Sequence, residues 1–322
     1  MNRNARITAL ALAAWLGSAV NSLAAQSLPS YSSMNPMVQR RSGLMTIPWV
    51  PEGNRWRITW LTDYASTIEY TDLPAIQYVQ DAELLRLEMT ATRGLGRRGF
   101  LLVSAAFQGA YDGFLDGFLD WYHDFTGLHV DARKLRPKND FAYEVNRAGE
   151  NPIAYSPSSG FLGDVRVGAG MRHSSHWMTA LTLTLPTSTG PVGFRRSVPS
   201  VNATSTLRSD FGGRFTYEGT LSAGYTAAHG ELKELQHTTF LMITQGLRGR
   251  VTGPLHLYAN LIYHSALYRD TGSKALDARE LTIDTGGFLK FKRGPEWILG
   301  LTEDLEPSGP AIDVAFRFGA RW

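Results

Sequence analysis

The sequence contains no cysteine, and after its first 25 residues it has no long apolar run. Without cysteine there can be no disulfide bond, no thiolate metal site and no lipid on an N-terminal cysteine. A membrane-spanning helix needs about 18 consecutive apolar residues, so a helical membrane protein is excluded. Charged residues make up 19% of the 322 residues and hydrophobic residues 43%, a balance that excludes global disorder.

A strong excess of charge of one sign is also missing. The formal net charge is +3 and the sequence pI is near 9.1. Arg3 and Arg6 lie in the first 25 residues, and without them the charge is about +1. Because nucleic-acid binding needs a basic surface, no nucleic-acid partner is expected.

The first 25 residues have the pattern of a cleaved export signal. Arg3 and Arg6 precede an apolar stretch at 7–20, and residues 22–25 supply the small side chains that a signal peptidase accepts. We therefore predict a signal peptide at 1–25.

From residue 54 onward, apolar and polar residues alternate with period two in segments of about ten residues. The last segment is the clearest, and its apolar face consists of Ile312, Val314, Phe316, Phe318, Ala320 and Trp322. The pattern predicts twelve strands, at 54–64, 83–93, 100–110, 162–172, 176–186, 209–217, 219–228, 238–248, 253–264, 280–292, 296–306 and 312–322. Connections after every second strand are short, and most of the others are longer.

Three features favour a membrane barrel over a soluble β-sandwich. The segments are about ten residues long, whereas an average soluble strand has five or six residues. Short and long connections alternate along the chain, and the chain ends on an aromatic residue. In lipid every backbone group must be paired, so the sheet must close on itself. We predict an all-β fold, a transmembrane antiparallel β-barrel of about 12 strands at 54–322, preceded by a periplasmic segment at 26–53 that enters or caps the periplasmic mouth.

This architecture predicts the outer membrane of a Gram-negative bacterium. Aromatic residues on the outward phase lie near strand ends, where the lipid headgroups would be: Trp56, Trp60, Trp177, Tyr263, Trp297 and Trp322. The expected partners are outer-membrane lipid and lipopolysaccharide, together with the barrel-insertion machinery, which would act through the C-terminal strand that ends at Trp322.

The segment Asp112–Leu128, DGFLDGFLDWYHDFTGL, resembles a motif of domain-of-unknown-function family 3187. The family pattern runs approximately Gly-Gly-Phe-Leu-Asp-Gly-Phe-Ile, an acidic residue, Gly, Trp-His-Asp and then Phe-Gly-Leu. Here Asp112 and Trp121 each replace a glycine, and Tyr122 replaces the tryptophan. Other similar landmarks are Asn35-Pro36, Gly94-Leu95-Gly96 and Leu185-Pro186-Thr187. The resemblance implies an uncharacterised Gram-negative outer-membrane barrel and no established activity.

The long extracellular loop at 111–161 contains a predicted amphipathic helix. Its apolar side chains recur at spacings of three and four: Phe114, Leu115, Phe118, Tyr122 and Phe125. Candidate binding residues lie beside them: Asp112, Asp116, Asp120, His123 and Asp124. These residues form either a site for a cation, of unknown identity, or a solvated face neutralised by basic residues at 133–138. The helix could lie on the outer leaflet, cover the barrel mouth or enter the lumen.

The inward phase of the strands carries charges of both signs. The candidate lumen-lining residues are Arg55, Arg57, Arg86, Glu88, Arg166, Asp284, Lys290, Asp313 and Arg317. They predict either a salt-bridge network that fills a narrow barrel or the lining of a water-filled path.

No cofactor is expected, and no catalytic residue is assigned. Residues 94–99 match the GxGxxG pattern, but a strand follows them where a nucleotide-binding helix should begin. The pair His264-Ser265 lies near the outer rim, yet adjacent strand residues point to opposite faces and cannot share a proton. An enzyme is therefore not expected.

These observations favour a pore or uptake channel for small solutes, with the 111–161 loop as a gate or recognition element. The alternatives are an outer-membrane lipid hydrolase and a non-conducting structural or binding barrel. A filled lumen would favour the non-conducting barrel.

Overall fold

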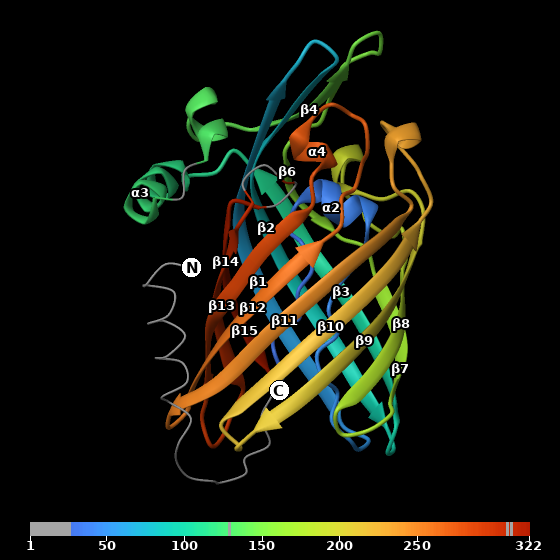
Figure 1. The fold of residues 1–322 in the computed structure, drawn as a ribbon, viewed down its shortest axis with the longest axis vertical. Coiled ribbons are helices and arrows are strands. Elements are labelled where there is room, and N and C mark those ends of the chain that lie inside the picture. The colour runs from blue at the N-terminus through green and yellow to red at the C-terminus, as the bar shows by residue number, and fades with distance from the viewer. Residues whose placement is uncertain (1–26, 128–129, 307–308, 310–311) are drawn as a thin grey trace, which may run out of the picture.

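Twelve antiparallel strands form a closed wall in the computed structural model, which describes residues 27–127, 130–306, 309 and 312–322 (Figure 1). The wall strands are β1 (Trp56–Asp72), β2 (Ile76–Leu95), β3 (Gly99–Tyr111), β7 (Arg166–Arg172), β8 (Trp177–Thr184), β9 (Ser200–Phe211), β10 (Phe215–Thr226), β11 (Thr239–Thr252), β12 (Leu255–His264), β13 (Glu280–Lys290), β14 (Glu296–Asp304) and β15 (Val314–Arg321). The last strand pairs with the first, from Thr59 opposite Arg321 to Ser66 opposite Val314. This pairing leaves the wall without a free edge.

The two ends of the barrel differ in their connections (Figure 1). At one end, the turn end, the strands are joined by turns of two to five residues, at 96–98, 173–176, 212–214, 253–254 and 291–295. At the other end, the loop end, the connections include 112–165, 185–199, 227–238, 265–279 and 305–313. The predicted asymmetry is therefore confirmed.

Smaller elements surround the loop end. Strand β4 (Ala142–Arg147) pairs with the outer part of β2 and with β5 (Ile153–Ala154), and β6 (Ser158–Leu162) pairs with β3. The helices are α2 (Pro36–Arg41), α3 (Asp116–Thr126) and α4 (Lys274–Asp277), and the 3-10 helices are η1 (Asp131–Leu135), η2 (Val192–Phe194) and η3 (Lys233–Leu235). In the described chain, no helix has both the length and the apolar character needed to cross a membrane.

The twelve-stranded barrel predicted from the alternation is confirmed, and the largest differences in strand limits are in β9 and in β1 and β2. Strand β9 covers Ser200–Phe211 and not 209–217, because the chain turns at Gly212 and Gly213, which both have positive φ. Strands β1 and β2 extend beyond the predicted limits and form a hairpin that projects above the rim. The predicted signal peptide at 1–25 lies outside the described residues.

Side chains on the outer face are apolar, and those facing the interior are mainly polar. Leu257 and Phe318 are 50% and 41% exposed on the outer face. By contrast, Glu218, Asp284 and Arg317 are buried inside the wall. This arrangement is the reverse of a soluble β-sandwich, whose apolar side chains face inward.

Candidate functional site in the barrel lumen

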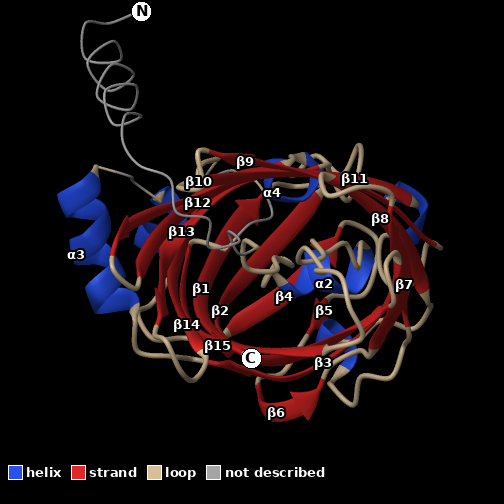
Figure 2. Ribbon diagram, turned by 90° about the horizontal axis from the view of Figure 1, so that it is seen from below, coloured by secondary structure: helices blue, strands red, loops and turns tan. Residues whose placement is uncertain are grey.

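The interior of the barrel contains the N-terminal part of the described chain. Residues 27–50, which we call the lumen hairpin, lie inside the wall (Figure 2). They run from the turn end, where Ser27 contacts Arg321, toward the loop end, form α2 there and return to Arg57 at the turn end (Figure 1). The two arms are joined by hydrogen bonds from Tyr31 N to Thr46 Oγ1 (2.7 Å), from Thr46 N to Tyr31 O (2.8 Å) and from Trp49 N to Ser27 Oγ (2.8 Å). Every residue of the hairpin except Gln39 is buried.

Helix α2 forms the tip of the hairpin for local reasons. The Asn35 side chain caps the helix by accepting hydrogen bonds from the backbone N–H groups of Met37 and Val38. Pro36 follows at the first helical position, where its missing N–H is not needed. The side chain of Asn35 also donates to Glu69 of β1 at 2.6 Å, so the cap is fixed to the wall.

Arginine side chains of the wall bind main-chain carbonyl groups of the lumen hairpin along its length. Near the turn end, Arg57 donates to Trp49 O at 2.9 Å, Arg172 to Val50 O at 2.9 Å and Arg321 to Ser27 O at 3.0 Å. Farther in, Arg86 donates to Ser32 O at 3.0 Å, and Arg196 of the 185–199 loop donates to Gln39 O. A guanidinium group supplies several fixed donors, which suits it to backbone carbonyls that no strand pairs.

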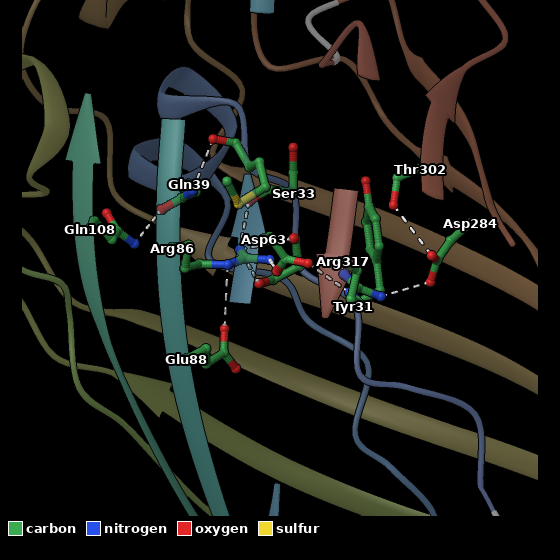
Figure 3. A network of polar contacts seen from close by, with 12 residues as sticks. Tyr31, Ser33, Gln39, Asp63, Arg86, Glu88, Gln108, Asp284, Thr302 and Arg317 are labelled. Atoms are coloured by element: carbon green, nitrogen blue, oxygen red, sulfur yellow. Dashed lines mark hydrogen bonds and ion pairs between the residues drawn. The ribbon is translucent and has the colours of Figure 1, made fainter. Parts of the chain in front are cut away.

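Behind these contacts, ion pairs connect neighbouring strands across the inner face of the wall (Figure 3). Asp63 of β1 lies between Arg86 of β2 (2.8 Å) and Arg317 of β15 (2.7 Å). Arg317 also pairs with Asp284 of β13 at 2.9 Å, and Glu88 lies 3.9 Å from Arg86. All five side chains are buried, so each charge depends on its partners for compensation.

Near the loop end, the tip of the hairpin is held by the 227–238 loop. Arg40 forms an ion pair with Glu231, and Arg41 donates to His237 O at 3.1 Å and lies 2.7 Å from His229 Nδ1. Burial, with the nearby positive charge of Arg41, lowers the pKa of His229 to about 4. The imidazole is therefore neutral at neutral pH and accepts a hydrogen bond from Arg41.

A small cavity remains between α2 and the wall. Its volume is about 20 Å³, and its lining includes Arg40, Arg86, Glu88, Arg166 and Arg196. A space of this size holds on the order of one water molecule. In the described chain, the hairpin therefore occupies the region through which a solute would pass here.

The lumen-lining residues named from the sequence have different surroundings. Arg57, Arg86, Glu88, Arg166, Asp284 and Arg317 belong to the interior network, in which Arg166 lies 3.7 Å from Glu88. Arg55 and Lys290 are both exposed at the turn end. Asp313 instead contacts His123 and Arg133 of the 112–165 loop, because it lies in a bend just before β15.

Helix α3 packs against the outer side of the wall and lies outside the lumen (Figure 2). Leu115 and Leu119 contact Val314, and Phe118 lies 5.8 Å from Phe316 between ring centroids. Of the five candidate binding residues, only His123 is buried. Asp116 pairs with Arg133, Asp120 pairs with Lys138, and Asp112 and Asp124 are exposed.

One serine–histidine contact was not expected from the sequence. His264 Nε2 lies 2.9 Å from Oγ of Ser42 in the lumen hairpin, and not beside the side chain of Ser265. Ser42 and His264 are 1% and 3% exposed. No signal in the sequence links two residues that are 222 positions apart.

Comparison with known proteins gives the following matches. The family model described as "Protein of unknown function (DUF3187)" matches residues 7–322. The curated proteins gave no match.

Among solved structures, the chain is similar to the COG4313 outer membrane channel from Pseudomonas putida F1, with 11% identity, 85% of this chain and 96% of that chain covered, and a TM-score of 0.52. It is also similar to the translocator domain of autotransporter NalP from Neisseria meningitidis (8% identity, 84% and 89% covered, TM-score 0.45). A third similar structure is the Pseudomonas putida toluene transporter TodX (10% identity, 84% and 89% covered, TM-score 0.39). At these identities, the likeness to the first structure shows the fold alone.

Proposed function

The chain belongs to the family of proteins of unknown function DUF3187, and we propose that it is an outer-membrane channel for small solutes that its own N-terminal hairpin closes. The lumen is filled, which alone would favour the non-conducting barrel, but the single observation that carries the channel proposal is that the filling is a separate segment, the lumen hairpin, inside a complete barrel. The wall closes through β1 and β15 without it. Removing the hairpin would therefore leave the hydrogen bonds between the strands in place.

The hairpin is held by apolar packing and by polar contacts, and the polar contacts near the turn end can exchange with water. It forms no β-ladder with the wall, and many of its contacts are single hydrogen bonds from arginine side chains to carbonyl groups. Water can replace such bonds one at a time when the segment shifts, and each exchanged bond from a charged donor has a net free energy of about 1.5–3 kcal/mol. Arg57, Arg172 and Arg321 would then line an open path.

The outer surface supports placement in a membrane. Exposed apolar side chains cover the wall strands, and Trp56, Trp177 and Trp322 are exposed near the turn end, where an aromatic belt would lie at the periplasmic interface. Short turns would face the periplasm and the longer loops the outside. Export through a signal peptide at 1–25 belongs to the same proposal.

Helix α3 would contact lipid on the outside of the barrel. Leu115 and Leu119 face the wall, whereas Phe114, Trp121 and Phe125 are 70%, 59% and 78% exposed. Aromatic side chains on an amphipathic helix favour the boundary between headgroups and acyl chains. We therefore place α3 at the outer-leaflet interface, in contact with lipopolysaccharide.

The proposal is tested by solute entry into liposomes. Wild-type protein and a variant lacking residues 27–50 are reconstituted at equal density, and swelling is measured in small sugars and amino acids. Swelling that is faster with the deletion variant than with the wild type supports the channel. A folded deletion variant that admits no solute contradicts it and favours the non-conducting barrel.

The same sample tests the lipid hydrolase. Ser42 of the lumen hairpin and His264 of β12 are at hydrogen-bond distance, but both are buried where the hairpin meets the wall. Fatty-acid release from phospholipid by the wild type, and its loss in His264→Ala, would contradict the channel proposal and support a lipid hydrolase.

A further inference from the structure

Three side chains from separate segments meet beneath helix α3. They are His123 of α3, Glu303 of β14 and Asp313, and we call them the His123 cluster. His123 Nε2 lies 3.0 Å from Asp313 Oδ1 and 3.9 Å from Glu303 Oε1. The three side chains are 4%, 7% and 7% exposed, so helix α3 and the wall shield the cluster from solvent.

We propose that the His123 cluster binds a divalent first-row transition-metal ion, of which zinc is the test case, and that this ion fastens α3 to the barrel wall. The three potential ligand atoms lie within 4.8 Å of one another. Zinc binds imidazole nitrogen and carboxylate oxygen at about 2.0–2.2 Å, which in tetrahedral geometry separates neighbouring ligand atoms by roughly 3.3–3.6 Å. The observed separations bracket this range.

The surrounding donors leave the inner oxygen atoms of both carboxylates available. The Tyr122 hydroxyl donates to Glu303 Oε2 at 3.1 Å, and Arg133 Nε donates to Asp313 Oδ2 at 2.7 Å. In each carboxylate the other oxygen, Oε1 of Glu303 and Oδ1 of Asp313, faces His123. In metal sites, hydrogen-bond donors to the second oxygen of a carboxylate ligand orient that ligand.

The imidazole of His123 provides a second, independent observation. Among the described residues, neither ring nitrogen makes a hydrogen bond of acceptable geometry, although the side chain is buried and Nε2 lies 3.0 Å from Asp313 Oδ1 and 3.9 Å from Glu303 Oε1. A buried polar group normally has a partner, because leaving it without one costs about 1–3 kcal/mol. A metal ion bound to Nε2 would supply that partner.

The local charge also favours a cation. Arg133 is shared by Asp313 and Asp116, and in the described chain Glu303 forms no ion pair with an arginine or lysine. A divalent ion would balance the remaining negative charge. One imidazole and two carboxylates are a ligand set that suits zinc and related ions better than calcium, which prefers oxygen ligands alone.

This inference does not rest on channel activity, since the cluster lies outside the lumen. It also differs from the cation site considered from the sequence, because Asp112, Asp120 and Asp124 take no part. The bound ion would connect the 112–165 loop to β14 and to the start of β15. The loop would consequently be held to the wall more firmly when metal is present.

The test measures zinc binding to the full-length refolded protein after removal of metal with a chelator. Isothermal titration with zinc chloride alone is expected to show one saturable site in the wild type and none in His123→Ala or Asp313→Asn. Tyr122→Phe is expected to weaken binding by about 10–100-fold, because the outer donor to Glu303 is lost. The matched controls Asp124→Asn and His176→Ala, exposed residues outside the cluster, should bind as the wild type does.

A second measurement uses only the wild-type protein, so its result does not depend on whether a variant folds. Limited proteolysis of wild-type protein is expected to cut the 112–140 region more slowly with zinc than with chelator, at an unchanged rate elsewhere. Absence of a saturable site in the wild type would overturn the proposal. Binding that survives in His123→Ala, or that disappears in His176→Ala, would overturn it as well.

Discussion

At the scale of single residues, the interior of this barrel depends on paired charges. Arg317 lies between Asp63 and Asp284, and all three side chains are buried. Taking charges out of water is costly, so the cluster is stable only while it is complete. Removing its central cation therefore costs more than the contacts themselves contribute.

We predict that Arg317→Met lowers the free energy of unfolding by about 3–5 kcal/mol, because two buried carboxylates lose their shared partner. The measurement is urea unfolding of the refolded protein in detergent micelles, followed by tryptophan fluorescence. The control Arg97→Met changes an exposed residue of a short turn and should alter stability by less than about 0.5 kcal/mol. Equal losses in the two variants would show that the interior network contributes little.

His229 provides a pH-dependent contact at the tip of the lumen hairpin. Its pKa is lowered to about 4 in the folded protein, chiefly by burial, whereas an unfolded chain titrates near about 6.5. The folded state binds fewer protons than the unfolded chain, so the neutral imidazole favours the folded state. This contribution to the free energy of unfolding is complete above a pH of about 6.5 and is lost as the pH falls toward 4. Protonation would also place a second cation beside Arg41, 2.7 Å away.

We predict that solute entry through the wild-type protein increases as the pH falls from 6.5 to 4.5. The increase should be smaller in His229→Asn. Asparagine keeps a neutral acceptor for Arg41 but does not titrate in this range. Liposome swelling at each pH measures the difference between the two proteins. An identical pH profile for both would exclude His229 as a contributor.

The sequence predicts the face on which a side chain lies, but not the residue that it contacts. The period-two pattern places Arg86, Glu88 and Arg317 on the inner face, because side chains alternate along a strand. It cannot find the carbonyl of Ser32 that Arg86 binds, or Glu303 and Asp313 beside His123, since these contacts join distant parts of the chain. Long-range partners need the register of the whole barrel.

At the scale of elements, strands were predictable where lipid-facing residues are large, and less so where they are small. Strand β15 is recognisable from Phe316 and Phe318, whereas the outward phase of β9 includes Ala203 and Ser205. Because the outward and inward side chains of β9 differ less, the pattern predicts a strand at 209–217, which crosses the turn at Gly212. The lumen hairpin has no periodic signal, because it is buried on all sides.

Helix α3 gives a prediction about the membrane surface. We expect bromine atoms on lipid acyl chains near the headgroups to quench Trp121, because this side chain is 59% exposed on the outer side of the barrel. The signal of Trp121 is the difference between the wild type and Trp121→Phe. The matched control is Trp49, which is 7% exposed in the lumen hairpin and should not be quenched. Quenching of Trp121 by iodide in water, and not by brominated lipid, would place α3 away from the membrane.

At the scale of the whole molecule, the structure combines a complete barrel with a separate segment that fills it. The wall accounts for stability in lipid, since every strand has two neighbours. In the proposed channel the lumen hairpin would account for closure, since it occupies the interior through apolar packing and through contacts with wall arginines. The sequence predicts the wall from its periodicity, but it leaves open whether the interior is filled or lines a water-filled path.

The most direct test of a channel closed by its lumen hairpin is single-channel recording in a planar bilayer. The proteins compared are the wild type, the variant without residues 27–50, and Arg57→Gln/Arg172→Gln, which loses two side-chain contacts to the hairpin near the turn end. We expect the wild type to be closed for nearly all of the record, the deletion variant to conduct continuously, and the double variant to have an intermediate open time. Absence of conductance in all three folded proteins, or equal conductance in all three, would contradict it.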